Sequence, residues 1–212
     1  VGKPPLRVAL LNLMPDKVAT EAQFARLLAG TDFDVELVLV RLESHSPRHI
    51  DPIHMMRHYR PLGAIMTERF DGFIVTGAPI ANIPFEEVKY WDEMVEIMKW
   101  TQSHVHHTMF ICWGAQAALH YFHKARRYRM ARKAFGVFRH RVVDTTSPFL
   151  RGFSDDLAIP VSRYNDIDRA SLDDDLEILI DNDEIGVCML GDRRLRAIYM
   201  LNHLEYDNRS LA

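Results

Sequence analysis

A cysteine stands where a predicted strand meets a predicted helix. Residues 109–111 are apolar and predict a short strand that runs directly into Cys112. Gly114 then allows a tight turn, and residues 115–119 favour a helix. At a helix N-terminus, the dipole and the backbone N–H groups stabilise a thiolate. The same groups, that of Trp113 among them, can hold an oxyanion. The pattern therefore predicts a cysteine nucleophile, although a buried core cysteine would fit it locally.

The second set of residues that could do chemistry is a histidine with a glutamate. His203 and Glu205 lie two positions apart, after a predicted strand at residues 196–201. In an extended chain such side chains point to the same side, so the carboxylate can orient the imidazole and stabilise its charged form. The other ring nitrogen can then face a nucleophile. Alone, the pair would be an ordinary surface feature; with Cys112 it predicts a Cys–His–Glu set.

Strands and helices alternate through the first 125 residues and must position these groups. The pattern predicts an α/β fold, a three-layer sandwich whose central, mostly parallel sheet has helices on both faces. Active sites of such folds lie at the carboxyl ends of the strands. We therefore expect the residues that follow these strands to gather at one edge. They are Lys17, Gly77, Cys112 and His203.

The remaining pattern gives the expected elements. The strands are expected at residues 6–13, 35–40, 71–76, 137–143, 176–180, 186–190 and 196–201. Helices are expected at 20–28, 86–103 and 115–122, the first with a capping box at Thr20 and Gln23. Residues 43–68 favour a loop with one or two short helices, and 124–133 form a basic stretch. The acidic segments at 173–175 and 181–184 are expected to be solvent-exposed turns.

The composition is that of an ordinary globular protein. The chain has 212 residues, 48% apolar and 26% charged, and a formal net charge of −3. Such a balance predicts no general attraction to nucleic acid or membranes. The two cysteines, Cys112 and Cys188, suit a reducing cytosol, and neither a signal peptide nor a membrane span is visible. We expect one cytoplasmic domain over residues 1–212, trimmed at both ends.

Several histidines have the spacing of metal ligands. They are His104, His106 and His107 in one stretch, and His54 and His58 in another. No cysteine or carboxylate completes either set, so the sequence predicts no metal site.

Six segments, spread over nearly the whole chain, closely resemble the homoserine O-acyltransferases, the succinyl- and acetyltransferases of methionine biosynthesis. The segments are residues 11–17 with Thr20 and Glu21, 71–79, 84–91, 111–117, 135–138 and 203–207. The resemblance implies a fold similar to the class I glutamine amidotransferases. It also implies ping-pong transfer of an acyl group from acyl-CoA to the hydroxyl of homoserine.

The resemblance also implies residue roles. Cys112 would accept the acyl group, His203 would act as general base, and Glu205 would support it. Lys17, Lys133 and Ser162 match family residues that contact substrates, although each lysine alone would be read as a solvated surface charge. The co-substrate would be acyl-CoA, with no resident cofactor. We further expect a homodimer that needs neither nucleic acid nor a membrane.

Three positions depart from the family pattern. Asn202 and Leu204 stand where the family has glycine and proline beside the base, which puts the local backbone in doubt. Ala81 stands where glycine accompanies succinyl donors and glutamate acetyl donors, and its small size favours succinyl. Most members also continue past this C-terminus with an arginine that binds the acceptor. The alternatives are the same chemistry on L-serine, a glutamine amidotransferase-like cysteine hydrolase, and a non-enzymatic relative that only binds a metabolite.

Overall fold

The computed structural model describes residues 4–45 and 50–211. The chain divides into two compact units, Val1–Met109 and Phe110–Ala212. Residues 46–49, near the start of the predicted loop at 43–68, lie outside the described residues, as do the chain ends. The prediction of a single domain stays a prediction. No helix within the described residues is long and apolar enough to cross a membrane.

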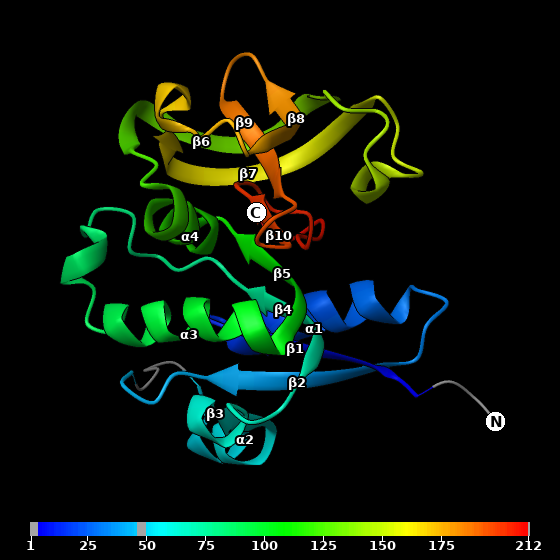
Figure 1. Ribbon diagram of the computed structural model, residues 1–212, viewed down its shortest axis with the longest axis vertical. Helices are drawn as coiled ribbons and strands as arrows, with labels where there is room; N and C mark the ends of the chain where they lie inside the picture. The colour runs from blue at the N-terminus through cyan, green and yellow to red at the C-terminus, as the bar shows by residue number, and fades with distance from the viewer. Residues whose placement is uncertain (1–3, 46–49, 212) are drawn as a thin grey trace. The chain divides into compact units, whose positions relative to one another are not determined.

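The first unit is built on parallel strands (Figure 1). Its elements are β1 (Leu6–Leu11), α1 (Lys17–Ala29), β2 (Val35–Arg41), α2 (Pro52–His58), β3 (Tyr59–Pro61), β4 (Phe70–Val75), α3 (Trp91–His104) and most of β5 (Val105–Ile111), with short 3₁₀ turns at Leu62–Ala64 and Phe85–Glu87. The strand order is β3-β2-β1-β4-β5, and β1 pairs in parallel with β2 and β4. The end of β1 is fully buried, as expected for a strand covered on both faces.

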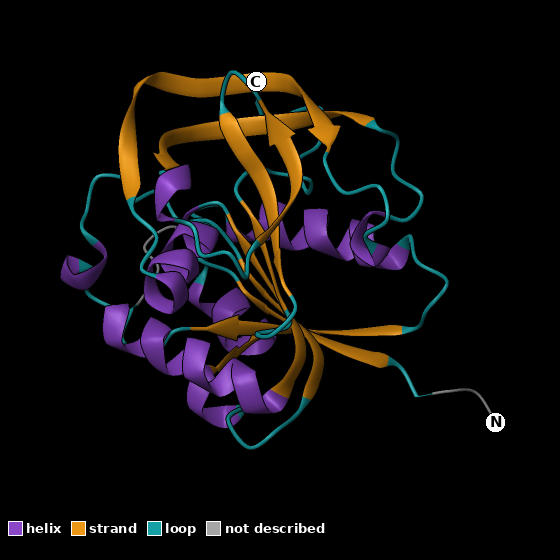
Figure 2. Ribbon diagram, turned by 45° about the horizontal axis from the view of Figure 1, so that its top comes forward, coloured by secondary structure: helices purple, strands orange, loops and turns teal. Residues whose placement is uncertain are grey.

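The second unit is antiparallel. After the end of β5 come α4 (Trp113–His123), β6 (Arg127–Val142), β7 (Asp156–Ile167), β8 (Glu177–Asn182), β9 (Gly186–Asp192) and β10 (Ala197–Met200), with 3₁₀ turns at Pro148–Leu150 and Arg169–Ser171. The order is β10-β9-β8-β6-β7. Figure 2 shows the long, curved ribbon that β6 and β7 form. The α/β prediction is thus confirmed, with parallel pairs in the first unit and antiparallel pairs in the second.

Two predicted helix starts were wrong. Helix α1 begins at Lys17 because Asp16 caps it, accepting a hydrogen bond from the Ala19 N–H at 3.0 Å. Thr20 therefore lies inside the helix and donates its hydroxyl to the Asp16 carbonyl. Helix α3 begins at Trp91 rather than residue 86, because Val88 has an extended backbone that ends the preceding 3₁₀ turn.

Strands β3 and β7 were missed, and β6 was predicted too short. The basic stretch forms the first half of β6, where four charged residues in seven positions hide the alternation typical of a strand. Strand β7 contains Pro160, which weakens a strand prediction. Eleven paired positions between β6 and β7 override these local signals.

Candidate functional site

The predicted elbow is present, but the cysteine itself makes the turn. Cys112 caps helix α4 with φ 50° and ψ −112°, a backbone conformation that costs energy for a residue with a side chain. Its N–H donates to the Met200 carbonyl at 2.7 Å, and its carbonyl accepts from the Gln116 N–H at 3.1 Å. The tight turn predicted at Gly114 was wrong, because the helix begins directly after Cys112 and Gly114 lies buried in its first turn.

His203 and Glu205 are buried in the loop that follows β10. Their exposed fractions are 2% and 4%, so they are not a surface pair. The Nδ1 atom of His203 lies 2.7 Å from Oε1 of Glu205, and the His203 N–H donates to the Pro160 carbonyl at 3.0 Å. The imidazole also hydrogen-bonds to the side chain of Cys112. Since Nδ1 is hydrogen-bonded to Glu205, the other ring nitrogen, Nε2, is the one that hydrogen-bonds to Cys112.

The electrostatics of this set favour an imidazolium. Burial by itself lowers the pKa of His203, but the charge of the Cys112 thiolate, the hydrogen bond to it, and Glu205 together raise that pKa well above its usual value. Tyr206 stacks on the imidazole with ring centroids 4.1 Å apart and planes at 10°. Burial, followed by the charges of Cys112 and Glu205, raises the pKa of the Tyr206 hydroxyl. The geometry therefore suits a thiolate–imidazolium pair held in low dielectric.

Trp113 occupies the first position of α4, as the elbow prediction required. The first N–H groups of an α-helix have no carbonyl partner four residues earlier in the helix. They are the groups that can face an oxyanion formed next to the Cys112 sulfur. The oxyanion role of the Trp113 backbone remains a prediction.

Ser162 and Lys133 lie on the paired strands β6 and β7. Ser162 pairs with Phe135, and the Lys133 ammonium lies 4.4 Å from the centroid of the Phe135 ring. Strand β7 is hydrogen-bonded to the elements of the candidate site at two points. Pro160 accepts from His203, and the carbonyl of Asn165 accepts from the Gln116 side chain at 3.2 Å. The structure thus brings the strand that carries Ser162 next to His203 and the first turn of α4.

Lys17 and Ala81 belong to the first unit. Lys17 is 6% exposed, so it is not the solvated charge that its sequence alone suggests. Its ammonium donates to the Asn12 carbonyl, and burial, only partly offset by Glu21, lowers its pKa to about 8. Lys17 and Gly77 follow the carboxyl ends of the neighbouring strands β1 and β4, as expected. Ala81 is half-buried in the turn after β4.

A buried polar network beside His203 was missed by sequence reasoning. The side chain of Asn202, fully buried, accepts from Arg163 Nε at 3.1 Å and lies 2.9 Å from Nε2 of His140. Arg163 also pairs with Asp166 at 2.7 Å. The only available signal was Asn202 itself, as a departure from the family glycine. The network therefore provides hydrogen-bond partners that hold Asn202, the residue before His203, in place.

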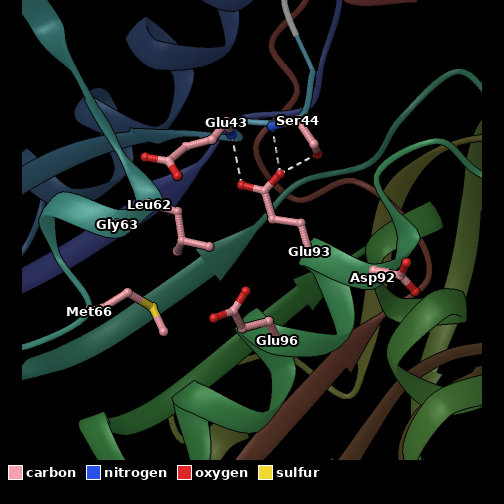
Figure 3. A pocket seen from close by; sticks show the side chains of 8 residues that line it. All are labelled: Glu43, Ser44, Leu62, Gly63, Met66, Asp92, Glu93 and Glu96. Carbon is pink, nitrogen blue, oxygen red and sulfur yellow. Dashed lines mark hydrogen bonds between the residues drawn. The ribbon is translucent and has the colours of Figure 1, made fainter.

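The pocket in Figure 3 has different chemistry. It is a hollow of about 340 Å³ in the first unit, lined by Glu43, Ser44, Leu62, Gly63, Met66, Asp92, Glu93 and Glu96. Glu93 accepts hydrogen bonds from the N–H groups of Glu43 and Ser44 at 2.7 and 2.9 Å. The carboxylates that line this hollow repel anions, so the hollow does not suit a phosphate-bearing substrate. Within the described residues, no group of three or more His, Cys, Asp or Glu could hold a metal ion.

Comparisons with known proteins show the family to which the chain belongs. The family model for homoserine O-succinyltransferase matches residues 3–212. A homoserine O-succinyltransferase of Pelagibacterium halotolerans is 64% identical over 208 residues, covering 98% of this chain and 68% of the relative. A homoserine O-acetyltransferase of Brucella canis is 53% identical over 210 residues, covering 98% and 69%. A glutamine amidotransferase from Thermotoga maritima shares the fold, with a TM-score of 0.65 at 14% identity over 96% of this chain and 77% of that one.

Proposed function

Because the chain belongs to the homoserine O-succinyltransferase family and is a homoserine O-acyltransferase, we propose that it works through an acyl-cysteine on Cys112. The donor in this proposal is an acyl-CoA. The observation that carries the proposal is the buried set of Cys112, His203 and Glu205, joined by hydrogen bonds. Such a set is the arrangement that activates a thiol for acyl transfer.

In the first half-reaction, the Cys112 thiolate attacks the thioester carbonyl of the donor. The carbonyl oxygen becomes an oxyanion, which the N–H groups at the start of α4 stabilise. The carbon–sulfur bond to coenzyme A then breaks. The departing thiolate takes the proton of the His203 imidazolium, and the enzyme is left with a thioester on Cys112 and a neutral imidazole.

In the second half-reaction, the homoserine hydroxyl attacks this thioester while His203 removes its proton. Acylation prepares His203 for that task. The raised pKa depends on the thiolate charge of Cys112 and its hydrogen bond, and both are absent once the sulfur is acylated. The pKa of His203 then falls, so the neutral imidazole can accept a proton. When the acyl group leaves, the thiolate–imidazolium pair returns.

The finer assignments follow from single residues. Ala81 leaves space without adding charge, which favours a succinyl donor, in keeping with the name of the 64% identical relative. Lys17, Lys133 and Ser162 contact the substrates in this proposal, because cationic and hydroxyl groups suit carboxylates and phosphates. We place the enzyme in the cytoplasm, in keeping with its free cysteines. We further propose that it is a homodimer and that it supplies O-acylhomoserine to methionine biosynthesis.

Intact-mass measurement tests the acyl-cysteine. The protein is mixed with succinyl-CoA or acetyl-CoA, without acceptor, and we expect the mass of one acyl group to be added. The adduct should be lost in Cys112→Ser and retained in the matched variant Cys188→Ser, whose cysteine is fully buried elsewhere. Homoserine should then remove the group and L-serine should not. Absence of an adduct with both donors overturns the proposal, and glutamine hydrolysis in its place would favour the amidotransferase-like alternative.

The charge state of His203 gives a second test. Since its raised pKa rests largely on the Cys112 thiolate, we expect the imidazolium to persist above pH 8 in the wild type and to be lost only as the pH rises further. In Cys112→Ser that pKa should fall. Titration of the imidazole nitrogens by NMR measures both, with His140 as the internal control because burial lowers its pKa. A His203 that titrates at the same pH in both proteins contradicts the coupling.

A further inference from the structure

The solvent-facing side of β6 and β7 carries two cations that lie on exposed aromatic rings. The guanidinium carbon of Arg129 lies 5.2 Å from the centroid of the Tyr164 ring. The Lys133 ammonium lies 5.3 Å from the same ring and 4.4 Å from that of Phe135. The exposed fractions of Phe135 and Tyr164 are 51% and 42%. We call these four residues the cation–aromatic face.

A bulge builds this face. The register between β6 and β7 shifts between Arg129 and Ala134, so that four residues of β6 lie opposite the single residue Tyr164. Arg129, just before this stretch, and Lys133, at its end, can therefore both reach the Tyr164 ring. Bulges of this kind are over-represented next to active sites, where they re-aim side chains.

These rings lie outside the buried cluster of the ribbon. The opposite side of the ribbon forms the core, with Ala134 and Val161 buried against Ile185. Three arginines of β6 outside this face form ion pairs: Arg132 with Glu184, Arg139 with Asp156, and Arg141 with Asp181 and Asp183. Within the described residues, no carboxylate forms an ion pair with Lys133. A cation that stays available beside exposed aromatic rings suits a ligand that has both phosphates and an aromatic base.

The position of the face points to the acyl donor. Strand β7 is bonded to the catalytic loop through Pro160 and His203, and to the first turn of α4 through Asn165 and Gln116. Tyr164 lies between these two anchor points. Adjacent residues on the same face of a strand are about 7 Å apart. Tyr164 therefore lies only a few residues along β7 from the contact with the catalytic loop.

We propose that the cation–aromatic face binds the nucleotide end of acyl-CoA. Arg129 and Lys133 meet its phosphates, and the adenine stacks on Tyr164 or Phe135. The pantetheine arm then runs along β7 past Ser162, toward Cys112. This inference rests on the proposed function, since it assumes that an acyl-CoA is the donor.

Two donors that carry the same thioester distinguish an effect on nucleotide binding from an effect on the chemical step. One is succinyl-CoA, and the other is the succinyl thioester of N-acetylcysteamine, which lacks the nucleotide. In Arg129→Gln and in Tyr164→Leu we expect the KM for succinyl-CoA to rise about tenfold, the effect of losing one charge-assisted contact or one stacked ring, with kcat little changed. The kcat/KM for the short thioester should stay at the wild-type value. Arg132→Gln, which removes an arginine of the same strand that lies outside the cation–aromatic face and pairs with Glu184, is the matched control and should leave both donors unaffected.

Adenosine 3′,5′-bisphosphate provides a binding readout without turnover. It should compete with succinyl-CoA in the wild type and bind about tenfold more weakly to Arg129→Gln. An unchanged KM in both variants, or an equal loss with both donors, overturns the nucleotide site while leaving the acyl-cysteine intact. Failure of both thioesters to acylate the wild-type Cys112 overturns the proposed function instead.

Discussion

Replacement of His203 by glutamine is expected to lower the rate of acyl transfer by about 10²- to 10⁴-fold, the usual contribution of a general acid–base group. In the proposed mechanism both half-reactions depend on this imidazole: its charged form stabilises the Cys112 thiolate, and its neutral form accepts the proton of the homoserine hydroxyl. Glutamine keeps a polar side chain of similar length but cannot be protonated. Rapid-quench mass measurement of the Cys112 adduct and steady-state kcat report the two steps separately.

Glu205→Gln distinguishes the role of the carboxylate. We expect a loss of about 10²-fold or more, because the amide can neither stabilise the imidazolium nor fix its tautomer as a carboxylate does. The pKa of His203 should also fall, since Glu205 contributes to raising it. His120→Gln, a matched change on helix α4 away from the thiol, should keep the wild-type rate. A His203→Gln enzyme that is as fast as the wild type would show that another group is the base.

Removal of the buried guanidinium of Arg163 is expected to cost about 3–5 kcal/mol of unfolding free energy, as when one partner of a buried ion pair is lost. Arg163 is 3% exposed and Asp166 is 4% exposed. Besides this carboxylate, the guanidinium serves Asn202 and the carbonyls of Asn165 and Ile185. Arg163→Met fills similar volume but leaves the Asp166 charge and these acceptors unpaired. Urea denaturation measures the loss.

Two further variants make that stability test specific. Arg132→Met removes an exposed ion pair with Glu184 and should cost only about 0–1 kcal/mol. The double variant Arg163→Met/Asp166→Asn should recover a large part of the loss, because no buried charge is then left unpaired. Asparagine fits the space of the carboxylate, whose Oδ2 lies 2.1 Å from where a Cβ on Gly186 would be. A full loss in the double variant would show that packing, and not the charge, is responsible.

Residue types and local order predicted much of the site. Cys112 was placed at a strand-to-helix junction from its apolar neighbours alone, and the junction is present. His203 and Glu205 were paired from their spacing, and their side chains are hydrogen-bonded. The family follows from segments spread over the whole chain, and the family model matches it from residue 3 to residue 212. Local patterns succeed here because strand and helix periodicity act over neighbouring residues.

Long-range pairing explains what the sequence did not predict. Strand β7 looks unpromising by itself because of Pro160, yet it forms once β6 lies beside it. The partners of Asn202 are 39 and 62 positions away, so no local pattern connects them. Lys17 resembles a surface charge in the sequence, but it is buried by its unit. Each of these outcomes depends on contacts between distant residues.

The sequence by itself determined which groups can do the chemistry and in what order they occur: a thiol at an elbow, then a histidine with its glutamate. Only the tertiary structure decided how they are held. It places the turn at Cys112 and not at Gly114, because the helix begins directly after the cysteine. It also buries His203, so that the thiolate and Glu205 act on it at low dielectric and raise its pKa. Residue types set the possible charges, whereas burial and distance set their strength.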